Sequence, residues 1–201
     1  MKLYYSPGAC SLASDIVLRE AKINADFVKV DLKAHKTEKG EDFATINPKN
    51  YVPTLVLDDG EVLTENVAIL PYLASLKPGL LPDSGMEKWH ALERLGFVST
   101  ELHKAFKPLF DPSSTDEAKN KAKEQIKRRL ANAEKMLGDR DNMVGNGFTV
   151  VDAYLFVMLM WCEKQGIAIP PSLQRYAAKM RERASVKEAL EFEGLAKKDK
   201  N

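Results

Sequence analysis

The sequence has few cysteines, no long apolar run and no excess of charge of either sign. Two cysteines, Cys10 and Cys162, are too few for a disulfide framework. The longest unbroken apolar run, residues 153–162, is about half as long as the roughly 20 residues that span a bilayer. With 30 basic and 29 acidic side chains, the formal net charge is +1, which argues against nucleic-acid binding by a strong positive field. We therefore expect no nucleic-acid partner and no membrane partner.

The first residues also lack the apolar core of a secretory signal peptide, because lysine, proline and glycine interrupt residues 1–8. Together with the scarcity of cysteine, this favours a cytoplasmic protein in a reducing compartment. The 201 residues are 44% hydrophobic, which is enough for a substantial core in one large domain or two small ones.

Residues 1–80 carry the pattern of an α/β domain. Strands are predicted at 2–5, 27–30, 54–57 and 61–64, and helices at 11–21 and 65–76, with a weak helix around 38–46. Asp59 and Gly60 mark a tight hairpin turn between the last two strands, because glycine supplies the positive φ such turns need. We expect a mixed four-stranded sheet with helices on both faces.

Residues 86–201 show helical periodicity throughout and follow a linker rich in proline and glycine at 78–85. Helices are predicted at 86–107, 115–137, 149–166, 172–183 and 186–191. Thr149 and Asp152 form a capping box at the start of the most apolar of these helices, which is a folding device and not a site. Cys162 lies inside that helix and is interpreted as a core residue.

Cys10 follows a strand and a Pro-Gly turn, where a helix is predicted to begin. A thiol at a helix N-terminus is close to free N–H groups and a partial positive charge, so we expect its pKa to fall. The alternative is a small buried core cysteine. No second cysteine completes a C-x-x-C motif, which disfavours a thioredoxin-type redox couple.

Two further motifs stand beside predicted strands. Val52-Pro53 precedes a strand, and a cis bond there would turn the Val52 backbone toward an extended peptide ligand. Glu65 and Asn66 stand where a strand gives way to a helix, so N–H groups could hold a carboxylate while the glutamate holds an ammonium. Helix capping is the structural alternative for this second pair.

In the helical half, Gly96, Thr100 and His103 share one helix face. Glycine on that face would allow a ligand to approach closely. A single histidine is more often structural than catalytic, so His103 is a candidate only if it faces Cys10.

The whole pattern resembles the cytosolic glutathione S-transferases, and the bacterial beta class in particular. The resemblance covers nearly the whole chain and is carried by six segments, at 2–12, 47–53, 63–66, 99–106, 148–156 and 189–195. It implies a thioredoxin-like N-terminal domain at 1–80 that binds glutathione. It also implies an all-α C-terminal domain at 86–201 that carries the hydrophobic substrate site.

By the same resemblance, Cys10 and His103 are the catalytic residues. The Val52 backbone would pair with the cysteinyl part of glutathione, and Glu65 and Asn66 would hold its γ-glutamyl end. Glu101 would reach the glutathione of a partner subunit. The implied glutathione set, with no metal, is Cys10, His35, Lys36, Val52, Pro53, Glu65, Asn66, Thr100, Glu101, Leu102, His103 and Lys104.

Three positions depart from the family pattern. His35 stands where lysine or arginine often holds the glycine carboxylate, Asn66 where serine or glycine is usual, and Gly96 where an asparagine often faces the ligand. The first change makes that contact weaker or pH-dependent, and the last removes a hydrogen bond.

The nucleophile implied is the thiol of glutathione itself, so the protein must favour its thiolate. We rank the candidate stabilising groups Cys10, His103, Ser11 and Tyr5, in that order. The sequence leaves open whether conjugation or thiol exchange takes place at this site.

The resemblance implies a homodimer that transfers glutathione to small hydrophobic electrophiles in detoxification. A second activity in disulfide or peroxide reduction stays open. The alternative is a non-catalytic binding or interaction module of the same fold. The presence of Cys10, Val52-Pro53, Glu65 and His103 together favours the enzyme.

Overall fold

The computed structural model describes residues 1–196. Its chain divides into two compact units, one formed by Met1–Lys77 together with the chain from Arg181 onward, the other by Pro78–Met180. The expected division placed residues 86–201 in one domain, but the last helix packs with the first unit, and residues 197–201 lie outside the described part. No helix among residues 1–196 has both the length and the apolar character needed to cross a bilayer.

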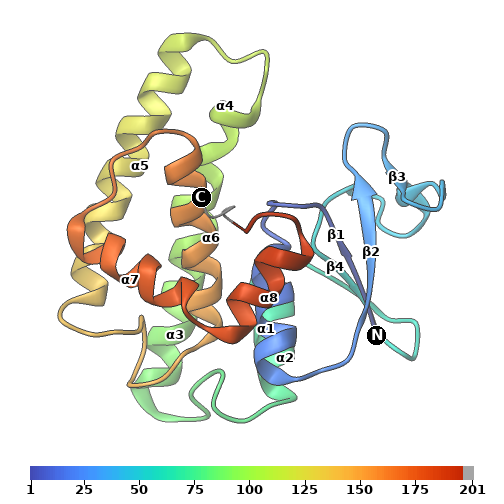
Figure 1. Ribbon diagram of the computed structural model, residues 1–201, viewed down its shortest axis with the longest axis horizontal. Helices are drawn as coiled ribbons and strands as arrows, with labels where there is room; N and C mark the ends of the chain where they lie inside the picture. The colour runs from blue at the N-terminus through green and yellow to red at the C-terminus, as the bar shows by residue number, and fades with distance from the viewer. Residues whose placement is uncertain (197–201) are drawn as a thin grey trace, which may run out of the picture. The chain divides into compact units, whose positions relative to one another are not determined.

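The first unit contains a mixed sheet in the order β3-β2-β1-β4-β5 (Figure 1). Its strands are β1 (Lys2–Tyr5), β2 (Asp26–Asp31), β3 (Lys36–Thr37), β4 (Thr54–Val56) and β5 (Val62–Thr64). β1 pairs parallel with β2 and antiparallel with β4, as a thioredoxin-like domain requires. Four strands were expected, and the fifth is the two-residue β3, which is too short to leave a sequence pattern.

Within residues 1–196, helices cover only one face of this sheet, so the expectation of helices on both faces is wrong. α1 (Leu12–Ala21) and α2 (Asn66–Ser75) pack together, and α8 (Ala184–Phe192) packs on α1 (Figure 1). Burial of α1 is nearly complete, because its apolar residues recur at helical spacing and meet α2 on one side and α8 on another. Glu20 of α1 accepts hydrogen bonds from Arg183 and Ser185, which fixes the start of α8.

The opposite face of the sheet carries a smaller apolar cluster. Tyr4, Val28, Val30, Phe43 and Val52 form it. The weak helix expected around 38–46 is wrong, because the chain there forms β3 and then only a short 3-10 turn, Phe43–Thr45. Phe43, which is fully buried, fills the space that a helix on this face would have covered.

The second unit is entirely helical within the described residues. It contains α3 (Gly85–Phe97), a π-helical turn (Val98–Leu102), a 3-10 turn (His103–Phe106), α4 (Lys107–Phe110), α5 (Asp116–Leu137), α6 (Val150–Lys164) and α7 (Pro171–Arg181). The single helix expected over 86–107 is therefore broken. Pro108 has no N–H to donate and its ring opposes the carbonyl four residues earlier, so a regular helix cannot continue into α4.

A buried carboxylate organises the core of the second unit. Asp152, fully buried in the first turn of α6, accepts hydrogen bonds from the backbone N–H of Met143 at 2.7 Å and from that of Thr149 at 2.8 Å. The hydroxyls of Thr149 and Tyr176 each donate to it at 2.7 Å. The capping box is confirmed, and it also ties the loop before α6 and helix α7 to that turn.

We expect Asp152→Ala to lower the free energy of unfolding by about 3–5 kcal/mol, because it leaves several buried donors without an acceptor. The midpoint of urea unfolding measures the loss. Asp139→Ala, at an exposed position of the same unit, is the control and should change stability by less than about 0.5 kcal/mol. Equal midpoints for the two variants would contradict the role given to Asp152.

Candidate glutathione site

Cys10 and the Val52-Pro53 turn are in direct contact. The Val52-Pro53 peptide bond is cis, which is the possibility that the sequence left open. The thiol of Cys10 donates to the Val52 carbonyl at a Sγ–O distance of 3.2 Å. Two separate sequence motifs thus meet within the first unit.

The thiol of Cys10 is not acidic, and the expected fall of its pKa is wrong. Helix α1 begins at Leu12, two residues later than the thiol, and Cys10 lies in the preceding turn with 9% of its surface exposed. Burial raises the pKa of Cys10 to about 12, and Glu65 adds to the rise. At neutral pH the Cys10 side chain is therefore a neutral S–H group.

Ser11 and Tyr5, the lower-ranked candidate donors, both make contacts within the first unit. Ser11 is fully buried, and its hydroxyl exchanges hydrogen bonds with the backbone of Ser6, closing the turn between β1 and α1. The ring of Tyr5 packs against Phe27 and Phe192 at centroid distances of 6.1 and 5.4 Å. Both residues serve the structure of the first unit.

Asn66 joins the starts of α1 and α2. Its side-chain amide donates to the backbone carbonyl of Cys10 at 3.0 Å and accepts from the hydroxyl of Ser14 at 3.0 Å. Because this side chain is 4% exposed, any ligand contact at Asn66 would fall to its backbone. The substitution of asparagine for the family's serine or glycine thus has a structural use.

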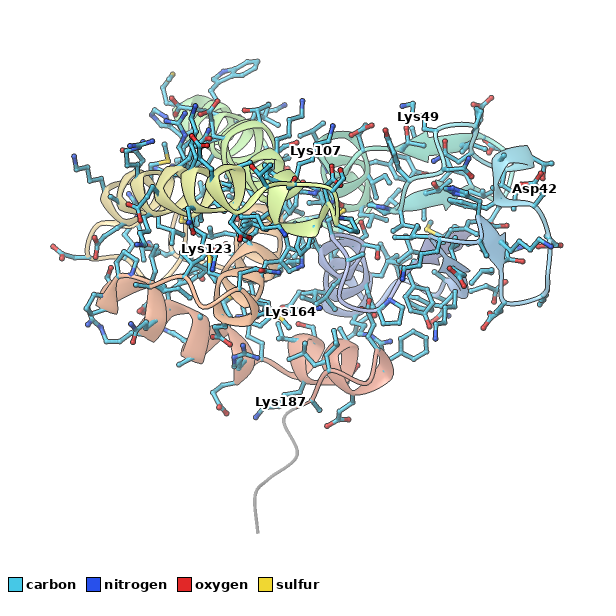
Figure 2. The ribbon with its side chains drawn as sticks, turned by 90° about the horizontal axis from the view of Figure 1, so that it is seen from above. Asp42, Lys49, Lys107, Lys123, Lys164 and Lys187 are labelled. Atoms are coloured by element: carbon cyan, nitrogen blue, oxygen red, sulfur yellow. The ribbon has the colours of Figure 1, made fainter. Side chains whose placement is uncertain are left out.

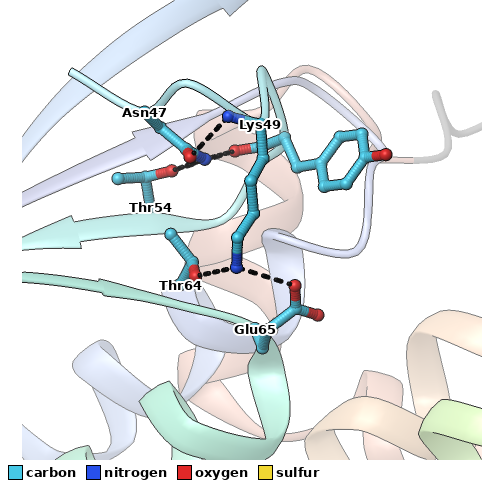
Figure 3. Close-up of polar contacts among 6 residues, drawn as sticks. Asn47, Lys49, Thr54, Thr64 and Glu65 are labelled. Atoms are coloured by element: carbon cyan, nitrogen blue, oxygen red, sulfur yellow. Dashed lines mark hydrogen bonds and ion pairs between the residues drawn. The ribbon is translucent and has the colours of Figure 1, made fainter. Parts of the chain in front are cut away.

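Glu65 stands beside Asn66 in a backbone conformation that is unusual for a side-chain-bearing residue. Its φ is 71°, in the region that favours glycine, and its side chain is 56% exposed. The Nζ of Lys49 lies 3.6 Å from a Glu65 carboxylate oxygen and donates to the Thr64 hydroxyl at 3.0 Å (Figure 3). Lys49 was not singled out from the sequence. The antiparallel pairing of Thr54 with Thr64 brings the turn that contains Lys49 close to Glu65.

His35 and Lys36 lie at the other side of the sheet. Both side chains are exposed. His35 ends the β2–β3 connection with a φ of 53°, and Lys36 begins β3. The carbonyl of His35 accepts from the Phe43 backbone, which fixes the connection. These two residues are not joined to Cys10 or Glu65 by the contacts of the described structure.

The remaining predicted residues belong to the second unit. Nδ1 of His103 is 2.5 Å from the Tyr154 hydroxyl, and its ring meets the Trp161 ring edge-on at 5.0 Å. Nδ1 of His103 is therefore engaged within the second unit. Tyr154 and Trp161, both on α6, were not singled out from the sequence, where they read only as core.

The neighbours of His103 differ widely in exposure. Thr100 donates to the Gly96 carbonyl at 3.0 Å, and Glu101 pairs with Arg129 at 2.5 Å. Lys104 is exposed. Leu102 has no exposed surface, so its side chain is a core residue and any ligand contact at this position would fall to its backbone. Among residues 1–196, no cluster of three or more histidine, cysteine or carboxylate side chains could hold a metal ion.

A carboxylate from the C-terminal segment supports the turn that carries Cys10. Glu193, 6% exposed, accepts a hydrogen bond from the backbone N–H of Gly8 at 2.7 Å. Burial raises the pKa of Glu193 to about 8, although the Gly8 N–H lowers it, and nearby Asp15 raises it further. Asp15 is itself fully buried beside Arg19, which pairs with it at 2.6 Å.

Family models match both parts of the chain. The model of the glutathione S-transferase N-terminal domain matches residues 8–76, and that of the glutathione S-transferase C-terminal domain matches residues 97–184. Glutathione S-transferase GstA of Escherichia coli O157:H7 is 42% identical over 201 residues, covering 97% of this chain and all of the relative.

Solved structures agree with these matches. A sphingomonad glutathione S-transferase complexed with glutathione is 51% identical, with a TM-score of 0.93 over 98% of this chain and 100% of that one. The bacterial beta class glutathione S-transferase of Sphingomonas chungbukensis is 48% identical, with a TM-score of 0.91 over the same shares.

The chain belongs to the glutathione S-transferase family. Within that family it is a bacterial beta-class enzyme, a transferase that uses glutathione as co-substrate.

We expect Cys10 to resist alkylation in the folded protein. Because its pKa is about 12, iodoacetamide at pH 7.5 should modify Cys10 at least about a hundredfold more slowly than free cysteine. Peptide mass mapping over time measures the rate, and the same protein in urea is the control in which Cys10 must react. Rapid modification of Cys10 without denaturant would show that the thiol is acidic after all.

We expect Glu193→Gln to stabilise the protein increasingly as the pH rises. Between the ordinary pKa of 4.5 and the folded value of about 8, the unfolded chain releases a proton that the folded chain keeps, so wild-type stability falls through this window. Glutamine keeps an acceptor for Gly8 and does not titrate. The gain in unfolding free energy should be roughly 1–3 kcal/mol larger at pH 8.5 than at pH 5.

Urea unfolding of both proteins at the two pH values checks this expectation. Glu191→Gln, at an exposed position in the last turn of α8, is the matched control and should show no pH-dependent gain. A gain for Glu193→Gln that is independent of pH would refute the titration.

Proposed function

We propose that this enzyme couples the thiol of glutathione to small hydrophobic electrophiles at a site built on the turn between β1 and α1. The cysteinyl part of glutathione pairs with the Val52 backbone, and the γ-glutamyl end is held by Glu65 and the backbone of Asn66. One observation carries this placement. Hydrogen bonds join Val52, Cys10 and Asn66, which come from three separate motifs, into one arrangement within the first unit.

The remaining glutathione contacts are proposed from the family resemblance. His35 and Lys36 would serve the glycine end, and Thr100, His103 and Lys104 would lie near the sulphur. The solved sphingomonad relative, which is 51% identical, is a complex with glutathione. That complex supports a glutathione site in this chain.

In this proposal Cys10 acts as a neutral hydrogen-bond donor. Its S–H group, which donates to Val52 in the described structure, donates to the glutathione thiolate instead when the ligand is present. Disulfide exchange through Cys10 would need its thiolate, which is scarce when the pKa is about 12. Conjugation is therefore favoured over thiol exchange.

A steady-state assay with a chromogenic aryl halide tests the function. The rate should require both glutathione and enzyme, and Cys10→Ala should keep at least about a tenth of it, because Cys10 contributes only a hydrogen bond. Cys162→Ala, at the other buried cysteine, is the matched control. Binding of glutathione without any acceleration would instead favour the non-catalytic binding module.

For His103 we expect a loss in kcat that exceeds the rise in the KM for glutathione. An imidazole near the sulphur stabilises the thiolate more than the thiol, so His103→Ala should also move the pH–rate profile upward. Tyr154→Phe, which removes the hydrogen bond to Nδ1, should shift both in the same direction by less.

His90→Ala is the control for this prediction, because His90 is half exposed on α3 and pairs only with Glu93 among its described contacts. A fallen melting temperature with an unshifted profile for His103→Ala would make His103 a structural residue.

We further propose a two-fold homodimer in which the first unit of one subunit meets the second unit of the other. Exposed apolar side chains on both units support it, Tyr51, Val62 and Val67 on the first and Met86 and Trp89 on the second. Glu101 would then serve the site of the partner. Sedimentation at micromolar concentration should give twice the 22.5 kDa mass of the chain, and a species of 22.5 kDa alone would contradict the dimer.

The location proposed for this enzyme is the cytoplasm, where glutathione keeps thiols reduced, which suits both the co-substrate and the two free cysteines. Fractionation of cells with antibody detection tests this location, and recovery from the periplasm would contradict it.

A further inference from the structure

Lys49 is held in a fixed place beside Glu65. Its backbone N–H donates to the Asn47 side chain at 3.1 Å, and the Asn47 amide donates to the Tyr51 carbonyl and the Thr54 hydroxyl, both at 2.9 Å (Figure 3). Asn47 is 2% exposed, so this turn is anchored in the interior of the first unit. The Lys49 side chain reaches from the anchored turn to the surface (Figure 2).

The ammonium group of Lys49 has donor capacity to spare. A lysine ammonium carries three N–H donors. Thr64 takes one at 3.0 Å and the Glu65 carboxylate attracts another from 3.6 Å. The third N–H of Lys49 can therefore donate to a ligand. The second carboxylate oxygen of Glu65 can accept from one, because Lys49 pairs with the other oxygen.

Glu65 and the Asn66 backbone offer the head group of glutathione an anion and a neutral N–H donor, but no cation. The head group of the tripeptide has an ammonium and a carboxylate on the same carbon, and the tripeptide as a whole carries a net negative charge at neutral pH. A lone carboxylate would attract the ammonium but repel the rest. A lysine beside that carboxylate removes the repulsion and offers a cation to the adjacent ligand carboxylate.

We propose that Lys49 is a specificity-determining residue for glutathione: Lys49 and Glu65 form a pair of opposite charges that recognises the α-amino acid head group, with its carboxylate between Lys49 and the Asn66 backbone N–H and its ammonium toward Glu65. This inference rests on the proposed placement of the γ-glutamyl end at Glu65. It selects ligands that have both charges on one carbon over peptides that have only one of them.

Isothermal titration calorimetry with two ligands separates the contribution of Lys49 to carboxylate binding from the rest of the affinity. The first is S-hexylglutathione, and the second is its analogue with a 4-aminobutanoyl group, which lacks the α-carboxylate. Lys49→Met should weaken S-hexylglutathione about three- to fivefold, the range for a half-exposed ion pair, and should leave the analogue unaffected. Lys49→Arg should restore tight binding.

Lys77→Met is the matched control, because Lys77 is an exposed lysine just beyond the opposite end of α2 and its loss changes the net charge equally. It should leave both affinities unchanged. Unchanged or tighter S-hexylglutathione binding by Lys49→Met would overturn the inference, and so would an equal loss for both ligands.

The proposed site is tested separately by wild type and Glu65→Gln. If wild type fails to bind S-hexylglutathione, or Glu65→Gln binds it as tightly as wild type, the placement of the head group is wrong. If both of these behave as expected and Lys49→Met does not, only the role of Lys49 is wrong.

Discussion

The buried amide of Asn66 is the contact on which the first unit's site depends. One side chain reaches the backbone of Cys10 and the hydroxyl of Ser14, so the first turn of α2 is fixed relative to the start of α1. Cys10 in turn reaches the turn before Pro53. Loss of the Asn66 amide would leave the Cys10 carbonyl and the Ser14 hydroxyl buried without the hydrogen bonds that they make with it. The starts of α1 and α2, which are more than fifty residues apart in the chain, would then no longer be joined by this side chain.

Burial prevails over helix electrostatics at Cys10. A helix N-terminus stabilises a nearby anion by about 0.3–1 kcal/mol at ordinary sites. A rise from 9.0 to about 12 in pKa corresponds to about 4 kcal/mol against the thiolate. The position of the thiol two residues before α1 weakens the favourable term further. The Cys10 thiol is therefore protonated at neutral pH, and in the proposed mechanism the ionised sulphur is that of glutathione.

Periodicity and turn chemistry predicted the sheet, the all-helical half and the capping box at Thr149, whereas they left the cis bond at Pro53 open. These features are local, because each depends on residues that are close together in the chain. The expectations that proved wrong concern features that depend on contacts between residues far apart in the chain. The strand β3 has only two residues, which is too short for an alternating pattern. Phe43 is buried where a helix was expected. Helix α8 packs on α1 in the first unit although it follows the helical part of the chain. The burial of Ser11 and Leu102 and the contact between Lys49 and Glu65 likewise follow from tertiary packing.

The last described segment has a consequence for how the chain is made. The backbone of Gly8 is hydrogen-bonded to Glu193, and α1 packs against α8. The first unit therefore begins to be synthesised first and is completed last. On the ribosome, the sheet and α1 emerge with the apolar side of α1 uncovered, and the whole helical unit follows before its cover arrives. During that interval α1 exposes a face that the finished molecule hides, which is the kind of surface that chaperones bind. A stop codon after α7 would leave that surface exposed permanently.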